Sequence, residues 1–204
     1  GTPVWEGYGL TEAAPVVAST MVHQRPKPGS VGSPLPGVEV RLVDEDGADA
    51  DEDDPGEIWV RGANLFSGYW PDGEGGPDAE GWYATGDVAY ADEDGDLHLV
   101  DRRRDLIIVS GFNVYPFEVE TVIAAHPDVA EVAVVGVPDV HTGETVKAYV
   151  VPVAGRALRR DQVVELCEQR LARFKCPSVV EIVETLPHTT TGKIARARLR
   201  EQQP

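Results

Sequence analysis

Four short clusters of polar residues carry the side-chain types that could do chemistry. They are Tyr8-Gly9-Leu10-Thr11-Glu12, Thr85-Gly86-Asp87, the arginine run Arg102-Arg103-Arg104, and Thr190-Thr191-Gly192-Lys193. In the first cluster Gly7 and Gly9 flank an aromatic residue, a pattern typical of a tight loop in which backbone and side chains meet a ligand. Taken singly, each of the other three clusters has a simpler explanation. Thr85-Gly86-Asp87 is also explained by a turn, the arginine run by a junction between domains, and the Thr-Gly-Lys segment by a helix cap.

The Thr-Gly-Lys triplet is not a phosphate-binding P-loop of the Walker type. That motif needs a glycine five positions before Gly192, where this chain has Pro187. It also needs Ser or Thr after the lysine, where the chain has Ile194. Alone, the triplet is explained by a helix cap followed by a solvated lysine.

The arginine run marks an abrupt change in charge along the chain. Residues 1–101 contain 4 Lys and Arg against 22 Asp and Glu, a net charge of −18, whereas residues 102–204 contain 14 against 13, a net charge of +1. Such asymmetry between halves indicates a domain boundary. Because 204 residues are enough for two cores of roughly 100 residues each, we expect domains at 1–101 and 105–204, with the arginine run 102–104 as the junction between them.

Bulk composition narrows the classes of partner. A net charge of −17 argues against nucleic acid and against anionic membrane surfaces. No apolar run reaches the ~18 residues of a membrane helix. The two cysteines, Cys167 and Cys176, are too few for a disulfide framework. We therefore expect a soluble, cytoplasmic protein whose partners are small molecules or another protein.

Short strands must position the first two clusters. Residues 38–43 and 56–62 alternate as half-buried strands, while prolines and glycines between positions 26 and 37 exclude a long helix. The acidic run between these strands places Asp49, Asp51 and Asp53 at alternate positions, as a calcium loop would. Its sixth position is not glycine and its twelfth is not glutamate, so we interpret it as a solvated hairpin loop.

The second half mixes helices with strands. Pro116 suits the first turn of a helix that runs to about Ala125, a second helix begins at Asp161, and Gly192 precedes a basic terminal helix. The predicted strands cover 105–110, 112–115, 130–137, 146–153 and 179–183. The expected fold is α+β: a small β-rich, distorted barrel-like subdomain, a hinge, and a compact α+β domain with a central three-stranded sheet.

The order and spacing of the clusters indicate a protein family far more specifically than any single cluster does. In chain order, YGLTE, GEIWVRG with GYW, GWYATGD, DRRRDLIIVSGFNVYPFEVE, LARFKCP and TTTGK closely resemble motifs of the adenylate-forming superfamily, particularly its acyl-CoA synthetases. The resemblance covers essentially the whole chain. In that family a carboxylic acid and ATP form an acyl-adenylate, and the same site passes the acyl group to coenzyme A. The resemblance therefore implies ATP, Mg²⁺ and coenzyme A as ligands and a fatty acid or related carboxylic acid as substrate.

The resemblance assigns roles in the first cluster. Tyr8, between Gly7 and Gly9, corresponds to the residue on the adenine face of ATP, Thr11 to a phosphate contact and Glu12 to a ligand of Mg²⁺. An aromatic face stacks on a base, and a hard carboxylate oxygen suits Mg²⁺ that also holds phosphate oxygens.

Three further positions match family residues near the hinge. Asp87 matches the aspartate that accepts hydrogen bonds from both ribose hydroxyls, since a carboxylate has two acceptor oxygens. Arg102 matches the arginine that also reaches the ribose. Arg104 falls on the hinge position, where the family commonly has Lys or Asp, so the arginine is a departure from the pattern.

The remaining assignments lie in the second half. Lys193 matches the lysine that engages the acyl carboxylate and the α-phosphate during adenylation, and a long stem ending in a compact cation suits that task. Gly111 and Phe112 match the loop that lines the channel for the pantetheine arm of coenzyme A, with a plain hairpin turn as the alternative for Gly111.

Parts of the family pattern are missing from this chain. The glycine- and threonine-rich phosphate loop and the region that shapes the acyl pocket are absent, and the chain begins at Gly1. We interpret it as the C-terminal portion of an enzyme whose N-terminal portion is missing, and expect it not to adenylate alone. Two alternatives stay open: an adenylation domain that acts on an amino acid or aryl acid with a carrier-protein acceptor, and a non-catalytic nucleotide-binding remnant.

Overall fold

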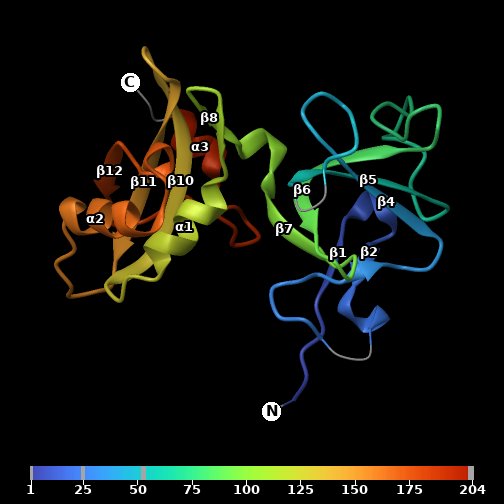
Figure 1. Ribbon diagram of the computed structural model, residues 1–204, viewed down its shortest axis with the longest axis horizontal. Helices are drawn as coiled ribbons and strands as arrows, with labels where there is room; N and C mark the ends of the chain where they lie inside the picture. The colour runs from blue at the N-terminus through green and yellow to red at the C-terminus, as the bar shows by residue number, and fades with distance from the viewer. Residues whose placement is uncertain (1, 24–25, 52–53, 202–204) are drawn as a thin grey trace. The chain divides into compact units, whose positions relative to one another are not determined.

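The structure is a computed structural model that describes residues 2–23, 26–51 and 54–201 (Figure 1). Gly1 and Asp53, both named above, lie outside these ranges. The chain divides into two compact units, Gly1–Arg103 and Arg104–Pro204. The division falls within the predicted hinge segment, whose role in motion stays a prediction. No helix in the described ranges is long and apolar enough to cross a membrane.

The first unit contains two antiparallel sheets. One has the order β1 (Gly7–Gly9), β2 (Val16–Ser19), β3 (Ser33–Pro34), and the other has the order β4 (Val38–Val43), β5 (Gly56–Gly62), β6 (Tyr83–Ala91), β7 (Leu97–Arg102). Two short 3-10 turns, Thr11–Ala13 and Thr20–Val22, flank β2. The predicted strands 38–43 and 56–62 are confirmed as β4 and β5. Strands β4 and β7 do not pair with each other in the described part of the chain, but an antiparallel bridge between Gly32 and Leu97 joins β7 to the segment that leads into β3. The predicted small β-rich subdomain is confirmed.

A bulge interrupts β6 at the Thr-Gly-Asp cluster. Trp59 of β5 pairs with Ala84 and Glu57 pairs with Val88, so one residue of β5 faces the three residues 85–87 of β6. The cluster is therefore an irregularity inside a strand, where its composition alone suggested a turn. Bulges re-aim side chains and are frequent next to active sites.

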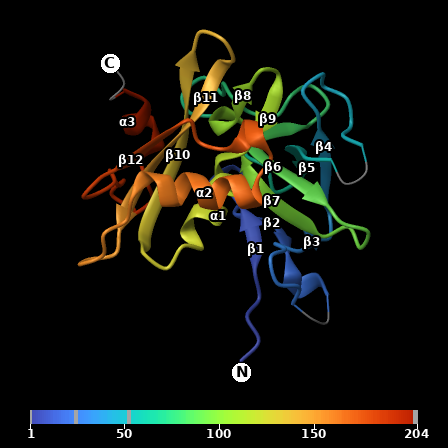
Figure 2. The same cartoon turned by 60° about the vertical axis from the view of Figure 1, so that its left-hand side comes forward.

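The second unit is a five-stranded sheet with helices on both faces (Figures 1 and 2). Its strands are β8 (Ile107–Val109), β9 (Phe112–Val114), β10 (Val129–Asp139), β11 (Gly143–Pro152) and β12 (Val179–Ile182), and its helices are α1 (Pro116–Ala124), α2 (Arg160–Arg170) and α3 (Arg196–Glu201). The three predicted central strands and three predicted helices are confirmed. The sheet is wider than expected because β8 pairs with the start of β11 and brings β9 with it.

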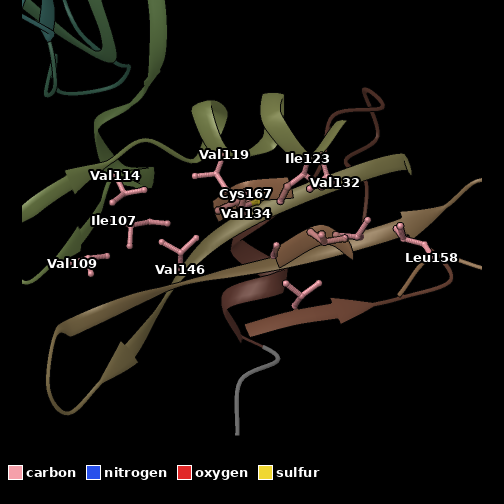
Figure 3. Close-up of a cluster of buried hydrophobic side chains, with 14 residues drawn as sticks. Ile107, Val109, Val114, Val119, Ile123, Val132, Val134, Val146, Leu158 and Cys167 are labelled. Carbon is pink, nitrogen blue, oxygen red and sulfur yellow. The ribbon is translucent and has the colours of Figure 1, made fainter. Parts of the chain in front are cut away.

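Alternating side chains of β10 serve two different cores. Val132 and Val134 join the larger core under α1 and α2, which Figure 3 shows with Val119 and Ile123 of α1 pointing toward the sheet. Ala133 and Val135, which alternate with them in β10, pack on the other face of the sheet with Leu199 of α3. Burial on both faces explains why this strand reads as a continuous β-branched run without polar alternation.

Candidate active site

Three of the predicted nucleotide-binding residues meet in the first unit. The Tyr8 hydroxyl donates a hydrogen bond to Asp87 Oδ2 at 2.7 Å, and Arg102 Nε lies 3.2 Å from Asp87 Oδ1. Asp87 and Arg102 are direct partners across β6 and β7. Burial, opposed by a hydrogen bond with Thr85 and reinforced by the Asp87 charge, raises the pKa of the Tyr8 phenol above its ordinary value, so the phenol stays protonated and donates.

The glycines beside Tyr8 are required by backbone packing. A Cβ at Gly9 would lie 1.9 Å from the carbonyl oxygen of Pro15, and one at Gly7 would lie 3.0 Å from the carbonyl oxygen of Ala18. Gly9 has no room for a side chain, and at Gly7 a side chain would require the neighbouring backbone to shift. The close approach of the next strand therefore explains these two glycines without a ligand, and their role in nucleotide binding stays a prediction.

The bulge at Thr85–Asp87 is held by a buried glutamate. Glu57 Oε1 accepts a hydrogen bond from the backbone N–H of Gly86 at 3.0 Å, and Glu57 Oε2 accepts one from Arg103 Nη1 at 2.5 Å. The side chain of Glu57 is only 6% exposed. Sequence reasoning missed this residue and left Arg103 without a role. No local pattern marks Glu57, because its alternation with Trp59 in β5 is typical of an outward-facing row.

Thr11 and Glu12 begin a short 3-10 turn directly after β1. Glu12 accepts a hydrogen bond from the Tyr69 hydroxyl of the Gly-Tyr-Trp motif, and its carbonyl oxygen accepts one from the N–H of Phe66 at 2.8 Å. The hydrogen bond from Tyr69 lowers the pKa of the Glu12 carboxyl, which is therefore ionised at neutral pH. Thr11 is exposed beside it.

The environment of Glu12 fits a magnesium ligand. Its carboxylate is anionic, partly exposed and oriented by Tyr69 through one oxygen. In the described ranges no three His, Cys, Asp or Glu side chains gather into a metal-binding group. Mg²⁺ is commonly held by one or two carboxylates together with substrate phosphates, so a single protein carboxylate is sufficient.

The Lys193 loop of the second unit is a short, self-bonded turn. Thr189 N–H donates to the carbonyl oxygen of Lys193 at 2.7 Å, and Gly192 N–H donates to the carbonyl oxygen of Thr189 at 3.0 Å. Gly192 has a φ of 83°, which favours glycine. The Lys193 side chain is exposed, and its ammonium forms no ion pair or hydrogen bond with any described residue.

Gly111 and Phe112 lie where strand β8 turns into β9. Ser110 and Gly111 form the two-residue connection with φ values of 52° and 83°, as a type I′ hairpin requires. The Phe112 ring is 56% exposed and stacks on Phe174 with ring centroids 4.8 Å apart. The turn explains Gly111 locally, and the stacking brings two family motifs of the second unit together. Their role in binding coenzyme A stays a prediction.

Arg104 lies at the first position of the second unit. Its side chain is 73% exposed, and its Nε lies 3.9 Å from Oδ1 of the buried Asp105. This long contact leaves the guanidinium in solvent. A pivot role for Arg104 is compatible with this exposure and stays a prediction.

Comparison with known proteins gives matches to both units. Residues 1–70 match the model of the AMP-binding enzyme family, and residues 118–193 match the model of the AMP-binding enzyme C-terminal domain. A long-chain-fatty-acid–CoA ligase of Yersinia pestis is 45% identical over 205 residues, covering all of this chain and 36% of the relative. The corresponding ligase of Bacillus subtilis is 40% identical over 206 residues. The chain thus spans little more than a third of the length of these relatives.

Solved structures give the same result. ATP-bound MatB from Rhodopseudomonas palustris aligns with a TM-score of 0.89 and 41% identity, covering 97% of this chain and 40% of that one. The o-succinylbenzoate CoA synthetase of Bacillus subtilis, solved with its acyl-adenylate intermediate, aligns over the whole chain and 42% of its own length with a TM-score of 0.87 and 34% identity. Together with the Tyr8, Asp87 and Arg102 cluster, these matches show that the chain belongs to the AMP-binding, adenylate-forming enzyme family.

Proposed function

We propose that this chain is the C-terminal part of an ATP-dependent ligase that joins a carboxylic acid, most simply a fatty acid, to coenzyme A. The observation that carries the proposal is the Asp87 carboxylate held between the Tyr8 hydroxyl and Arg102. It presents fixed acceptor oxygens suited to a ribose diol. The name of the Yersinia pestis relative supports long-chain fatty acids as the substrate class.

In the first half-reaction a carboxylate oxygen of the acid attacks the α-phosphorus of ATP, and pyrophosphate leaves. The exposed Lys193 ammonium supplies a mobile positive charge for the negative charge that develops on the α-phosphate. Thr11 binds phosphate oxygens, and the ionised Glu12 would hold Mg²⁺. When bound, Mg²⁺ neutralises phosphate charge. The Tyr69 hydroxyl keeps the Glu12 carboxylate in one orientation.

In the second half-reaction the thiol of coenzyme A loses its proton and attacks the acyl carbonyl carbon, and AMP leaves. Gly111 and Phe112 line the path of the pantetheine arm, and Arg104 is the pivot that exchanges Lys193 for this surface. The 204 residues lack the phosphate loop and acyl pocket, so we expect them to form no acyl-CoA by themselves. A cytoplasmic location stays a prediction from cysteine usage.

Substitution of Lys193 by alanine in the full-length ligase tests the proposal. Loss of one charge stabiliser should slow acid-dependent pyrophosphate exchange by ~10²–10³, while thioester formation from a supplied acyl-adenylate continues. Arg198→Gln is the matched control, because Arg198 is a nearby exposed cation without an ion pair to any described residue. Exchange at the wild-type rate in Lys193→Ala would refute the assignment. Transfer to a carrier protein in place of coenzyme A would favour an adenylation domain of the peptide-synthetase kind.

A further inference from the structure

Two buried carboxylates and two arginines form a connected network in the second unit. Arg196 Nη2 donates to Glu120 at 2.9 Å and 2.7 Å, one bond to each carboxylate oxygen, and Arg200 Nη2 donates to Asp105 Oδ1 at 2.7 Å. Arg196 Nη1 lies 4.0 Å from Asp105 Oδ2 and joins the two pairs. Charge-assisted bonds of this kind impose a specific geometry on the groups that they connect.

Other groups extend the network toward both ends of the unit. The N–H of Val134 in β10 donates to Glu120 Oε1 at 2.8 Å, which attaches this α1 carboxylate to the sheet. Asp105 directly follows Arg104, the proposed pivot, and is buried. The network therefore runs from the first residues of the unit to its last helix.

Helix α3 depends on these contacts for its position. It has only six residues, too few for a stable isolated helix. Leu199 is buried, and its carbonyl oxygen accepts a hydrogen bond from Tyr149 at 3.3 Å. Arg196 and Arg200, four residues apart, share one face of the helix and form the ion pairs. Without them, the burial of Leu199 and its hydrogen bond with Tyr149 would still help to hold the helix in place.

Arg196 is also an anchor for the Lys193 loop. Arg196 and Lys193 are three positions apart, so the backbone between them is at most about 10 Å long. The N–H of Ala195 donates to the carbonyl oxygen of Pro187 at 2.8 Å, which closes the loop at its base. The orientation of α3 thus sets the direction in which the loop leaves the domain.

We propose that the Glu120–Arg196 and Asp105–Arg200 pairs position Lys193 for adenylation, an inference that rests on the function proposed above. The network ties the base of the Lys193 loop to the backbone that follows Arg104, so that the lysine moves as one rigid part with the residue after the pivot. Arg196 is a positioning residue that acts through Lys193. Its loss harms the half-reaction that needs Lys193 and spares the other.

The test compares half-reactions in the full-length ligase. Arg196→Gln should slow pyrophosphate exchange by ~10–100-fold, because displacements of about 1 Å have effects of this size, and thioester formation from a supplied acyl-adenylate should change less than about twofold. Arg196→Lys keeps the charge without the two-pronged bond and should lose less. Arg198→Gln, on the exposed side of the same helix, should behave as the wild type. Equal loss of both half-reactions in Arg196→Gln would overturn the proposal.

A double substitution separates positioning from general damage. In a Lys193→Ala background, Arg196→Gln should slow pyrophosphate exchange no further, because residues that act as one unit have non-additive effects. Full additivity of the two losses would mean that Arg196 acts independently of the lysine and would overturn the proposal.

Hydrogen exchange gives a readout that does not need activity. Backbone amides of residues 187–195, followed by mass spectrometry, should exchange faster in Arg196→Gln than in the wild type or Arg198→Gln. Unchanged exchange would overturn the anchoring role whatever the activity. A wild-type protein that shows no pyrophosphate exchange would instead refute the proposed ligase function, and the exchange of this loop would still decide whether Arg196 anchors it.

Discussion

Replacement of Glu57 by alanine should destabilise the first unit and loosen the bulge that carries Asp87. Glu57 is the buried carboxylate that receives the Gly86 N–H at 3.0 Å and the Arg103 guanidinium at 2.5 Å. Alanine removes both acceptor oxygens, so the Gly86 N–H and the Arg103 guanidinium lose the Glu57 carboxylate as their hydrogen-bond partner. The Thr85–Asp87 segment then loses one attachment to β5 and keeps the hydrogen bond from the Thr85 hydroxyl to the Ile58 carbonyl at 2.8 Å.

The magnitude follows from the two contacts. A hydrogen bond from a backbone N–H to a charged carboxylate contributes about 1.5–3 kcal/mol. The Arg103 side chain is 51% exposed, so solvent reduces its ion pair with Glu57 to about 0–1 kcal/mol. We therefore expect Glu57→Ala to lower the free energy of unfolding of the first unit by about 1.5–4 kcal/mol. Glu57→Gln keeps an acceptor for Gly86 and should lower it by about 1 kcal/mol.

Tryptophan fluorescence in urea measures this effect in the first unit alone. All four tryptophans belong to that unit: Trp5, Trp59, Trp70 and Trp82. For a unit of this size, 3 kcal/mol corresponds to a urea midpoint lowered by roughly 2 M. Glu39→Ala is the matched control, because Glu39 forms an exposed ion pair with Arg61 in the same sheet. A Glu57→Ala midpoint equal to that of the control, or a Gln variant as unstable as the Ala variant, would refute the reasoning.

Two further predictions concern the hinge and the cysteines. Arg104→Pro in the full-length ligase restricts φ at the proposed pivot and should preserve one half-reaction while it abolishes the other. Separate assays of pyrophosphate exchange and thioester formation measure this. Equal loss of both half-reactions would argue against a hinge. Burial raises the pKa of the Cys167 thiol to about 12 and, less strongly, that of Cys176. At pH 8 a thiol reagent should therefore modify the partly exposed Cys176 first and Cys167 only after unfolding, and equal rates in the native protein would contradict this ordering.

Local signals in the sequence were sufficient for most elements of the second unit. Pro116 at the first turn predicted the start of α1, and the β-branched runs predicted β10, β11 and β12. The sequence also predicted strands at 105–110 and 112–115, which are β8 and β9. Their place in this sheet was not predictable, because it depends on the pairing of Val109 with Gly143, residues that are distant in sequence. Propensity describes single strands, whereas sheet order is a long-range property.

The same distinction applies to the candidate site. Family motifs pointed to Asp87 and Arg102, which the structure brings together. Glu57 escaped notice because alternation in β5 places it on the same side as Trp59, which reads as an outward-facing row. It is buried because Gly86 of β6 and Arg103, which directly follows β7, cover it. No local pattern encodes that coverage.

The two units differ in how far their site residues are already fixed. A carboxylate has about four acceptor positions. At Asp87 the Tyr8 hydroxyl occupies one through a hydrogen bond and Arg102 lies beside the other oxygen as an ion pair, which leaves acceptor positions for the hydroxyls of a ribose. The Asp87 carboxylate is thus held in place and still has acceptor positions for a nucleotide. Lys193 is the opposite case: the backbone of its loop is held by hydrogen bonds, but its ammonium forms no ion pair or hydrogen bond with a described residue. A rigid binding group in one unit and an unpaired cation on an anchored loop in the other suit a cycle in which the lysine is needed for the first half-reaction and must leave before the second.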